Sequence, residues 1–457
     1  MLVPKIDQKI GIEVYVTTTS GIGGSIRRNL DDFVVEEVLV DNSKATIDAT
    51  ENKLPIGATE FKQNFLLCVL VKRNWDTLIA VKNVAKKLGV EPSRIQIAGI
   101  KDAKAVTAQH LTIEGVSVEE ASKVNFKDLK FLPVGYFHEP LSAYFLLGNS
   151  FTIRIRDISH SKSNTENRIK KVMSEIEKIG GIPNFYGHQR FGTTRAITHL
   201  VGKALVQGDL QKAAMLFLAN PSFDEHPLSR QARADLQSSQ NFNQALQSFP
   251  VQLRYERIML SYLVEHPTDF VGAFRRLPLK LRMLFVQAYQ SFLFNRFLSA
   301  RIKCGLPLIE AELGDYVVNV ERSGLPMVKI GRVVDTASLK SINDLIKMGK
   351  MRLALPLIGF KQKLSHGKSG ELQMQILEEE GVELKNFRVD SLPEVSSKGE
   401  LRAAVSPVNF FAAQVTVDAV DAKRQQANLE FMLLRGSYAT ILLREIMKTR
   451  NPISAGF

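Results

Sequence analysis

Residues 99–109 read Gly-Ile-Lys-Asp-Ala-Lys-Ala-Val-Thr-Ala-Gln and set an aspartate between two lysines in a polar stretch. Because nearby cations keep a carboxylate ionised, Asp102 could act as a nucleophile or as a base. Thr107 and Gln109 add hydrogen-bonding groups just beyond it, whereas Lys101, as its direct neighbour, need not face it. The alternative is a solvated, charged turn, which the segment alone favours because Lys-Asp turns are common.

A second segment, residues 183–192, reads Pro-Asn-Phe-Tyr-Gly-His-Gln-Arg-Phe-Gly and interleaves polar groups with three aromatic rings. Aromatic rings stack on unstacked bases, arginine reaches phosphate, and an amide such as Asn184 can read a base edge. An aromatic loop packed on the core explains the pattern equally well. We interpret His188 as a structural or surface histidine, since the sequence names no partner for it.

Two later segments have weaker chemical signals. Residues 287–295 carry Tyr289, Phe292 and Leu293 at helical spacing, which favours a buried helix face over a binding surface. In residues 434–445, Gly436 and Ser437 open a predicted final helix. The backbone N–H groups at that helix start could bind phosphate, or the serine could simply cap the helix.

The elements around Asp102 can be predicted from apolar patterning. A strand begins at Phe33, and the apolar run from Phe65 to Val71 is typical of a buried strand. A helix capped by Asp76 should end at Gly89. A strand is then predicted over residues 94–100 and another over 111–113, with Lys101 to Ala108 as a polar loop between them.

The predicted secondary structure changes along the rest of the chain. Residues 148–156 alternate like a strand with one basic face, and residues 165–179 are helical. Helices dominate the middle, residues 361–402 are polar, and strands return near the end. The predicted later elements are helices at 209–218, 228–247, 251–265 and 279–303 and strands at 407–418 and 427–434. Strand-rich ends around a helical middle suggest one domain interrupted by another.

The composition limits the kind of protein. The chain has 457 residues, a formal net charge of +13 and 45% hydrophobic residues, which excludes a largely disordered chain. The positive charge suggests a polyanionic partner, most simply nucleic acid. Two cysteines and eight scattered histidines provide no recognisable metal-binding pattern. The start lacks a signal peptide and no apolar run could span a bilayer, so we expect a cytoplasmic protein.

Taken together and in this order, these segments resemble the TruD family of tRNA pseudouridine synthases. The residues that match the family's motifs are Asp32–Glu37 (DFxVEE), Gly99–Gln109 (GxKDxxAxTxQ), Gly148–Phe151 (GNxF), Asn184–Gly192, Gln290–Asn295 (QSxxFN) and Gly436–Glu445 (GSYAT…RE). They span residues 24–448 in register, and the spacing looks most like the archaeal branch of the family.

The resemblance implies an α+β fold. Its pseudouridine-synthase catalytic domain would have a mixed, largely antiparallel sheet with flanking helices, interrupted by an inserted α/β TRUD domain. From the change between strand-rich and helix-rich segments, we expect residues 1–204 and 403–457 to form the catalytic domain and residues 205–402 to form the insertion.

The resemblance also implies the reaction, isomerisation of a uridine of tRNA, uridine 13 of the D arm, without a cofactor. Asp102 corresponds to the catalytic aspartate, and Phe33 and Asn184 to positions around the target base. Tyr186 stands where the family more often has Phe, so its hydroxyl adds a polar group, and Arg27 stands where relatives commonly carry Lys. The predicted substrate-binding set is Phe33, Asn184, Tyr186, Arg27, Lys101, Thr107 and Gln109.

The implied partner is tRNA, with no membrane, no metal and no obligatory protein partner. One alternative is a non-catalytic RNA-binding or RNA-chaperone protein on the same scaffold, although such a protein would not need Asp102. Another is a metal-dependent nuclease or nucleotidyltransferase. The loop around Asp102 lacks the second carboxylate that two-metal sites normally need.

Overall fold

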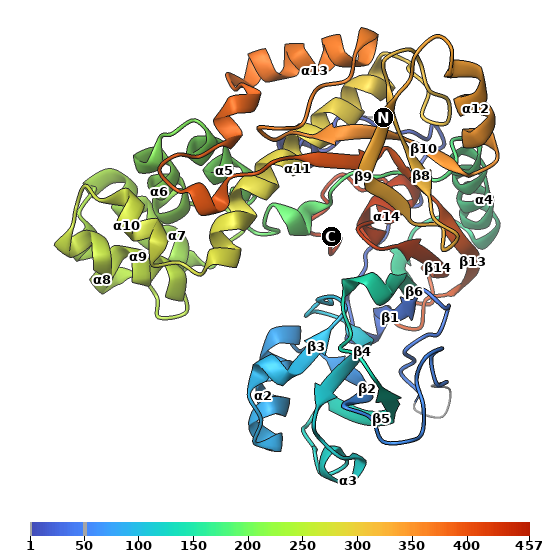
Figure 1. The fold of residues 1–457 in the computed structure, drawn as a ribbon, viewed down its shortest axis with the longest axis horizontal. Helices are drawn as coiled ribbons and strands as arrows, with labels where there is room; N and C mark the ends of the chain where they lie inside the picture. Colours follow the sequence, from blue (N-terminus) through green and yellow to red (C-terminus); the bar gives the residue numbers. More distant parts are fainter. Residues whose placement is uncertain (1, 49–52) are drawn as a thin grey trace.

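The computed structural model describes residues 2–48 and 53–457, and its largest element is a mixed sheet (Figure 1). Eight strands of the described residues form it: β1 Phe33–Leu39, β2 Phe65–Arg73, β3 Ile95–Ile97, β4 Val106–Glu114, β5 Leu129–Phe137, β6 Leu146–Ile158, β13 Val408–Val417 and β14 Gln425–Leu434. The order is β13-β14-β6-β1-β4-β2-β5, with β3 beside β4. Only β1 and β4 pair in parallel among these strands, which confirms the expected largely antiparallel sheet.

The segments of the chain that form this sheet also contain helices. They are α1 Lys5–Lys9, α2 Thr77–Leu88, α3 Val118–Ala121, α4 Lys162–Lys178 and α14 Ala439–Met447. The predicted cap of α2 is confirmed, since the Asp76 side chain accepts from two backbone N–H groups at the helix start. Gly89 ends that helix in the left-handed conformation, at φ 68°. At the other end of the sheet, α4 packs on β13 and contacts α14.

The loop before β4 is shorter than predicted. The sequence predicted a polar loop from Lys101 to Ala108, but β4 already begins at Val106. This strand lies between β1 and β2, so its residues up to Ile113 are buried in spite of the polar side chains among them. Polarity alone therefore placed the start of the strand too late.

A second, antiparallel sheet follows later in the chain. Its elements and the helices beside them are β8 Tyr316–Val320, β9 Pro326–Val333, α12 Leu339–Lys347, β10 Met351–Leu357, α13 Gly367–Glu380 and β11 Glu400–Ala403. The strand order is β11-β10-β8-β9. The polar segment 361–402 thus contains a full helix, α13, and ends in a strand. A two-residue pairing of β7 Ile182–Pro183 with β12 Val405–Ser406 brings distant segments together.

Between the two sheets the chain is helical. The helices are α5 Thr198–Val206, α6 Leu210–Ala219, α7 Pro227–Ser239, α8 Phe242–Ser248, α9 Arg254–Glu265, α10 Phe270–Arg275 and α11 Leu279–Lys303. The single helix predicted over 228–247 is wrong, because Gln240 adopts φ 51° and Asn241 caps a new helix. Figure 1 shows α6 to α10 gathered at one end of the molecule, away from β2 to β5.

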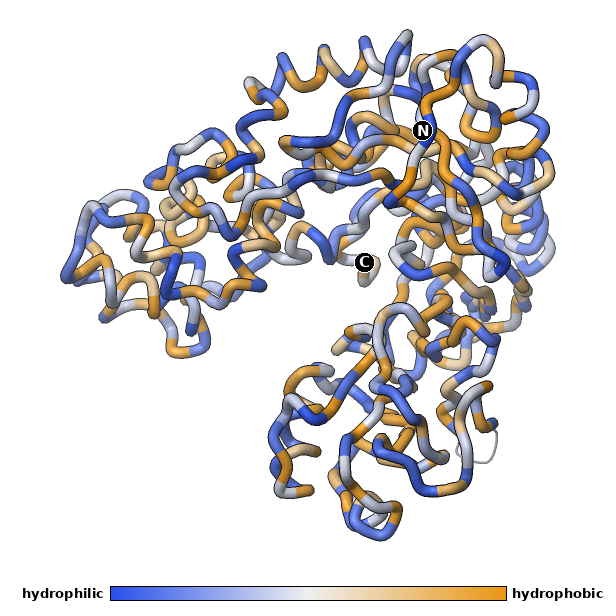
Figure 2. Tube along the Cα trace, in the orientation of Figure 1, coloured by the Kyte–Doolittle hydropathy of each residue, from blue (hydrophilic) through white to orange (hydrophobic). Residues whose placement is uncertain are grey.

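Helix α11 connects these parts. It packs against α5, α13 and β10, and its side chains Tyr289 and Leu293 are fully buried. Hydrophobic and hydrophilic stretches alternate along the chain throughout, as expected for elements that bury one face (Figure 2). The predicted domain boundary at residues 204 and 205 falls within α5, and the division into two domains stays a prediction.

None of the helices within residues 2–48 and 53–457 combines the length and the apolar character that a membrane span requires.

Candidate active site

Asp102 lies on the loop between β3 and β4, and its backbone is anchored by a buried lysine. The Lys72 ammonium donates to the Asp102 carbonyl oxygen at 2.7 Å and to that of Trp75 at 2.8 Å. Burial lowers the pKa of Lys72 to about 8, while the Asp102 carboxylate acts in the opposite direction. The Asp102 side chain itself is 37% exposed, so it is fixed at its base and accessible at its tip.

Arg27 is the cation that faces the Asp102 carboxylate. Its Nη2 lies 3.4 Å from Oδ2 of Asp102, and its Nη1 donates to the Gly456 carbonyl at 2.9 Å. The guanidinium lies 4.0 Å above the ring of Phe33, a residue that is only 1% exposed. Burial lowers the pKa of Arg27, and the interaction with Asp102 opposes that shift. The Phe33 ring therefore helps to hold the Arg27 guanidinium in place through a cation–π contact.

Lys101 points to a different, buried carboxylate. Its ammonium donates to Oδ1 of Asn149 at 2.8 Å and lies 3.6 Å from Glu37. Burial raises the pKa of Glu37 to about 7, and Lys101 acts to lower it. Lys101, Asn149 and Glu37 belong to three different predicted motifs, so these contacts connect the three motifs. Lys101 is therefore not the ion-pair partner of Asp102.

Thr107 and Gln109 lie on β4, beneath the loop, and both are fully buried. The Gln109 amide donates to the Gly99 carbonyl at 3.0 Å, and the Thr77 hydroxyl donates to the carbonyl of Lys101 at 3.2 Å. Among the described residues the Thr107 hydroxyl has no hydrogen-bond partner. Gln109, predicted to bind substrate, therefore supports the loop, whereas Thr107 is buried in the same strand. Together, Arg27, Phe33, Lys72 and Asp102 form what we call the carboxylate side.

A second group surrounds Asn184, which follows β7. Its amide nitrogen donates to the Ala403 carbonyl at 3.0 Å. Arg402 donates to the Asn184 side-chain oxygen at 2.7 Å and to its backbone carbonyl at 2.9 Å. Both ends of the amide are thus engaged within the protein, which fits holding the loop better than reading a base.

Tyr186 is held by its backbone and covered by an arginine. The Asn295 amide on α11 accepts from the Tyr186 N–H at 2.8 Å and donates to its carbonyl at 3.0 Å. The Arg402 guanidinium lies 3.9 Å from the ring centroid, and the Tyr438 ring packs at 6.0 Å. We call Asn184, Tyr186, Arg402 and Tyr438 the aromatic side.

Tyr438 packs against Tyr186 on the aromatic side, and its hydroxyl also senses the charge of Asp102 on the carboxylate side. Burial raises the pKa of its hydroxyl; Arg402 and Arg190 oppose that shift, whereas the charge of Asp102 adds to it. A half-exposed carboxylate therefore shares one electrostatic environment with two tyrosines and a pair of arginines. Such an arrangement can carry out nucleophilic or general-base chemistry on a planar ligand that stacks on a ring.

Sequence reasoning missed Lys72, Arg402 and Tyr438. Lys72 had a signal, since it is a charged residue at the end of an apolar strand, and Tyr438 lay within a motif that was noted for its glycine and serine. Arg402 had none, because it closes a polar segment without periodicity. The Ser437 hydroxyl donates to Ser406 instead of capping α14.

Two other predictions concern histidine and metal. His188 is buried, with its Nε2 2.9 Å from the Asp7 carboxylate, and this fits a structural role. In the described part of the chain, no three His, Cys, Asp or Glu side chains are grouped so that they could hold a metal ion.

Comparison with known proteins gives matches over nearly the whole chain. A family model described as tRNA pseudouridine synthase D (TruD) matches residues 9–446. Proteins named tRNA pseudouridine synthase D are similar: one from Methanosarcina mazei is 37% identical over 455 residues, 99% of both chains. One from Pyrococcus abyssi is 35% identical, covering 95% of this chain and 98% of its own. A crystal structure of the Methanosarcina mazei TruD superposes with a TM-score of 0.84 at 36% identity, covering 99% of this chain and 100% of that one.

Proposed function

The chain belongs to the tRNA pseudouridine synthase D (TruD) family and is a tRNA pseudouridine synthase, an isomerase, and from this premise we propose its target and its nucleophile. The target is uridine 13 in the D arm of tRNA. The nucleophile is the carboxylate of Asp102, and Arg27 is its partner. The observation that carries this proposal is the exposed tip of Asp102 beside Arg27, 3.4 Å away.

The reaction rearranges the uridine without consuming another reagent. The bond between the sugar and nitrogen 1 breaks, the base turns, and the sugar is rejoined through carbon 5. The proton that carbon 5 loses balances the one that nitrogen 1 gains. An anionic carboxylate can assist by attacking the sugar or the base, and the Arg27 guanidinium, 3.4 Å away, holds it in place.

The aromatic side fits the requirement that the uridine leave its stack. A base that is turned out of an RNA helix loses stacking energy, which an aromatic ring can replace. Tyr186 and Tyr438 offer two rings, 6.0 Å apart and edge to face. The Tyr438 hydroxyl, whose pKa burial raises, stays neutral at physiological pH and can donate a hydrogen bond.

The domain division that we propose follows the two sheets. Residues 1–204 and 403–457 would form the catalytic domain, because the large sheet takes β13 and β14 from the end of the chain. Residues 205–402 would form the inserted domain with the four-stranded sheet. The formal charge of +13 supports binding to the tRNA backbone, so affinity should fall as salt rises.

The test is to incubate the purified protein with unmodified tRNA transcript, without added metal or cofactor, and to map pseudouridine by carbodiimide-blocked primer extension. We expect a new stop at uridine 13 that is absent with Asp102→Asn. A stop at another uridine would overturn the target, and a stop that persists in Asp102→Asn would overturn the nucleophile. If tRNA binds and no stop forms, the result would favour a different RNA target or the non-catalytic RNA-binding alternative, and either would overturn uridine 13 as the target.

A further inference from the structure

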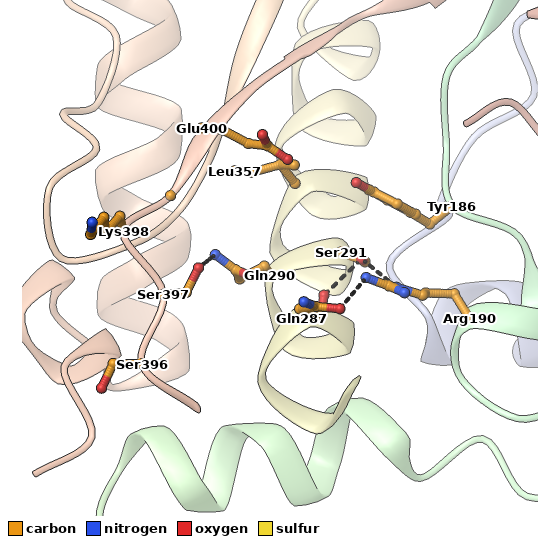
Figure 3. Close-up of a pocket in the computed structure, with 11 residues that line it drawn as sticks. Tyr186, Arg190, Gln287, Gln290, Ser291, Leu357, Ser396, Ser397, Lys398 and Glu400 are labelled. Atoms are coloured by element: carbon orange, nitrogen blue, oxygen red, sulfur yellow. Dashed lines mark hydrogen bonds between the residues drawn. The ribbon is translucent and has the colours of Figure 1, made fainter. Parts of the chain in front are cut away.

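Helix α11 carries a polar stripe that the proposed reaction does not use. Tyr289, Leu293 and Phe297 are buried, as the sequence predicted. Gln287, Gln290 and Ser291 follow the i, i+3, i+4 spacing of a single helix face. These three side chains project from α11 into a cavity of about 470 Å³ (Figure 3). That volume is within the range of about 300–1,000 Å³ typical of small-molecule sites.

The cavity adjoins the aromatic side of the active site. Tyr186 and Arg190 form one wall, and residues 396–400 form the opposite wall (Figure 3). The Gln290 amide fixes that opposite wall by donating to the Ser397 hydroxyl at 2.7 Å, and also to the Ile358 carbonyl. Because Tyr186 belongs to both sites, a ligand in the cavity would lie next to the target base.

The walls offer groups for both a base and a phosphate. Arg190 donates to the Ser291 hydroxyl at 3.2 Å and to the Gln287 side-chain oxygen at 3.3 Å. These bonds hold the guanidinium in place and, among the described residues, leave its Nη1 available. Lys398 is exposed at the rim, and so is Glu400, a hydrogen-bond acceptor. Amides recognise base edges, whereas arginine and lysine attract phosphate.

We propose that this cavity binds a second unpaired nucleotide of the tRNA, one that directly flanks the target uridine. Its base would contact the amide nitrogen of Gln287, which remains to donate, and its phosphate would lie between Arg190 and Lys398. The inference rests on the proposed function, because it assumes that an RNA nucleotide occupies the neighbouring site. It assigns the α11 stripe to substrate recognition and not only to packing.

The test couples a protein change to an RNA change. Gln287→Ala is assayed by kcat/KM for pseudouridine formation on intact tRNA and on two transcripts with one abasic residue, before or after the target. We expect about a tenfold loss on intact tRNA and less than a twofold loss on one of the abasic transcripts, since the contact is already missing there. Gln237→Ala, at an exposed position on α7, is the matched control and should change neither value.

Lys398→Ala tests the phosphate contact without disturbing a buried group. It should weaken tRNA binding by about threefold at low salt and reduce the slope of log Kd against log salt by about 1. Equal losses for Gln287→Ala on all three RNAs would mean that the stripe only supports the fold, and unchanged values on intact tRNA would mean that the cavity is not used. Either result overturns the proposal.

The failure of the proposed function would look different. If the wild-type protein modifies no uridine, the same comparison is made by Kd in the Asp102→Asn protein, with intact and abasic transcripts. Coupling between Gln287→Ala and one flanking base would then support the cavity even though the reaction is wrong. Loss of coupling in both kcat/KM and Kd overturns the cavity alone.

Discussion

The carboxylate side and the aromatic side of the active site are held in place in different ways. The Asp102 loop is anchored by Lys72, Thr77 and Gln109, all within about 40 residues of one another along the chain. The Tyr186 segment is anchored by Asn295 and by Arg402, which contacts Asn184 from 218 residues away.

Because the two sides are anchored separately, we infer that the carboxylate side carries out the reaction and that the aromatic side recognises the substrate. Strands and loops close in the sequence fix Asp102, and the Gly456 carbonyl near the end of the chain holds Arg27, so changes in the middle of the chain should leave both intact. The aromatic side depends on α11 and β11, so changes there should alter how the base is held. We therefore expect substitutions on the carboxylate side to act on kcat and those on the aromatic side to act mainly on KM.

The largest effect is expected for Arg27→Ala, which removes the cation beside Asp102. We expect kcat to fall by about 10²-fold, the loss typical of a misplaced reacting group, because Arg27 holds the Asp102 carboxylate, with little change in KM. Arg27→Lys should recover part of it, because it keeps the charge and loses the contact with Gly456. The control is Arg28→Ala, an exposed neighbour paired with Asp157. If steady-state kinetics showed that Arg27→Ala raises KM and leaves kcat unchanged, the assignment of the carboxylate side to the chemical step would be wrong.

The next largest effect is expected for Arg402→Ala on the aromatic side. It removes three hydrogen bonds and the guanidinium above Tyr186, so we expect kcat/KM to fall by about 10–30-fold, mostly through KM. Arg402→Lys should restore only part of kcat/KM, because a lysine ammonium cannot reproduce the paired hydrogen bonds that the Arg402 guanidinium donates to the two oxygens of Asn184. Arg388→Ala, with a side chain 75% exposed, is the control. A fall in kcat with KM unchanged would place Arg402 on the carboxylate side instead.

Phe33→Ala should show a smaller, indirect effect. The ring supports Arg27, so we expect about a tenfold loss of turnover while the Kd for tRNA changes less than twofold. Removing this core ring also costs about 3 kcal/mol of stability, so kinetics are compared below the melting transition. Phe431→Ala, another buried ring, should lower the melting temperature but not turnover. Equal losses of turnover and binding would make Phe33 part of the binding surface.

The smallest effect concerns the pH dependence of stability. Because burial raises the pKa of Glu37 from its ordinary 4.5 to about 7, the folded protein holds this proton over a range where the unfolded chain releases it. Glu37 by itself should therefore lower the free energy of unfolding as pH rises from about 4.5 to 7. His110 and His199 act in the opposite direction. Burial lowers the pKa of each to about 4, so between about pH 4 and 6.5 the unfolded chain binds protons that the folded chain does not, and their contribution to stability rises with pH.

Glu37→Gln should remove the contribution of Glu37. We expect the change in Tm from pH 5 to pH 7 to be more positive in Glu37→Gln than in the wild type, by on the order of 2 °C, because the histidine contributions are common to both proteins. Differential scanning calorimetry at the two pH values checks it. A variant whose Tm follows pH as steeply as the wild type would show that Glu37 does not titrate in this range.

Much of the carboxylate side could be predicted from the sequence, for a physical reason. The strand after Phe33, the helix capped by Asp76 and the strand from Phe65 are set by patterns within about ten residues. Helix α11 was predicted over its full length for the same reason. The start of β4 was not, because the burial of Thr107 comes from the strands on either side of it.

The aromatic side could be predicted only in part. The interleaved aromatic rings around Tyr186 pointed to a special loop, but nothing in residues 361–402 indicated Arg402. Its contacts exist because β12 pairs with β7 and brings the end of the middle segment beside Asn184. Such long-range contacts leave no periodic signal, so a single sequence does not reveal them.

The most direct test of the central claim is single-turnover kinetics of Asp102→Asn at saturating protein, with the Kd for tRNA measured on the same preparation. The claim is that the carboxylate side, with Asp102 as the nucleophile, supplies the chemistry and that the aromatic side supplies recognition. It predicts a Kd within about threefold of the wild type and product formation below about 10⁻³ of the wild-type rate. Product formation near the wild-type rate, or loss of binding equal to the loss of product, would contradict it.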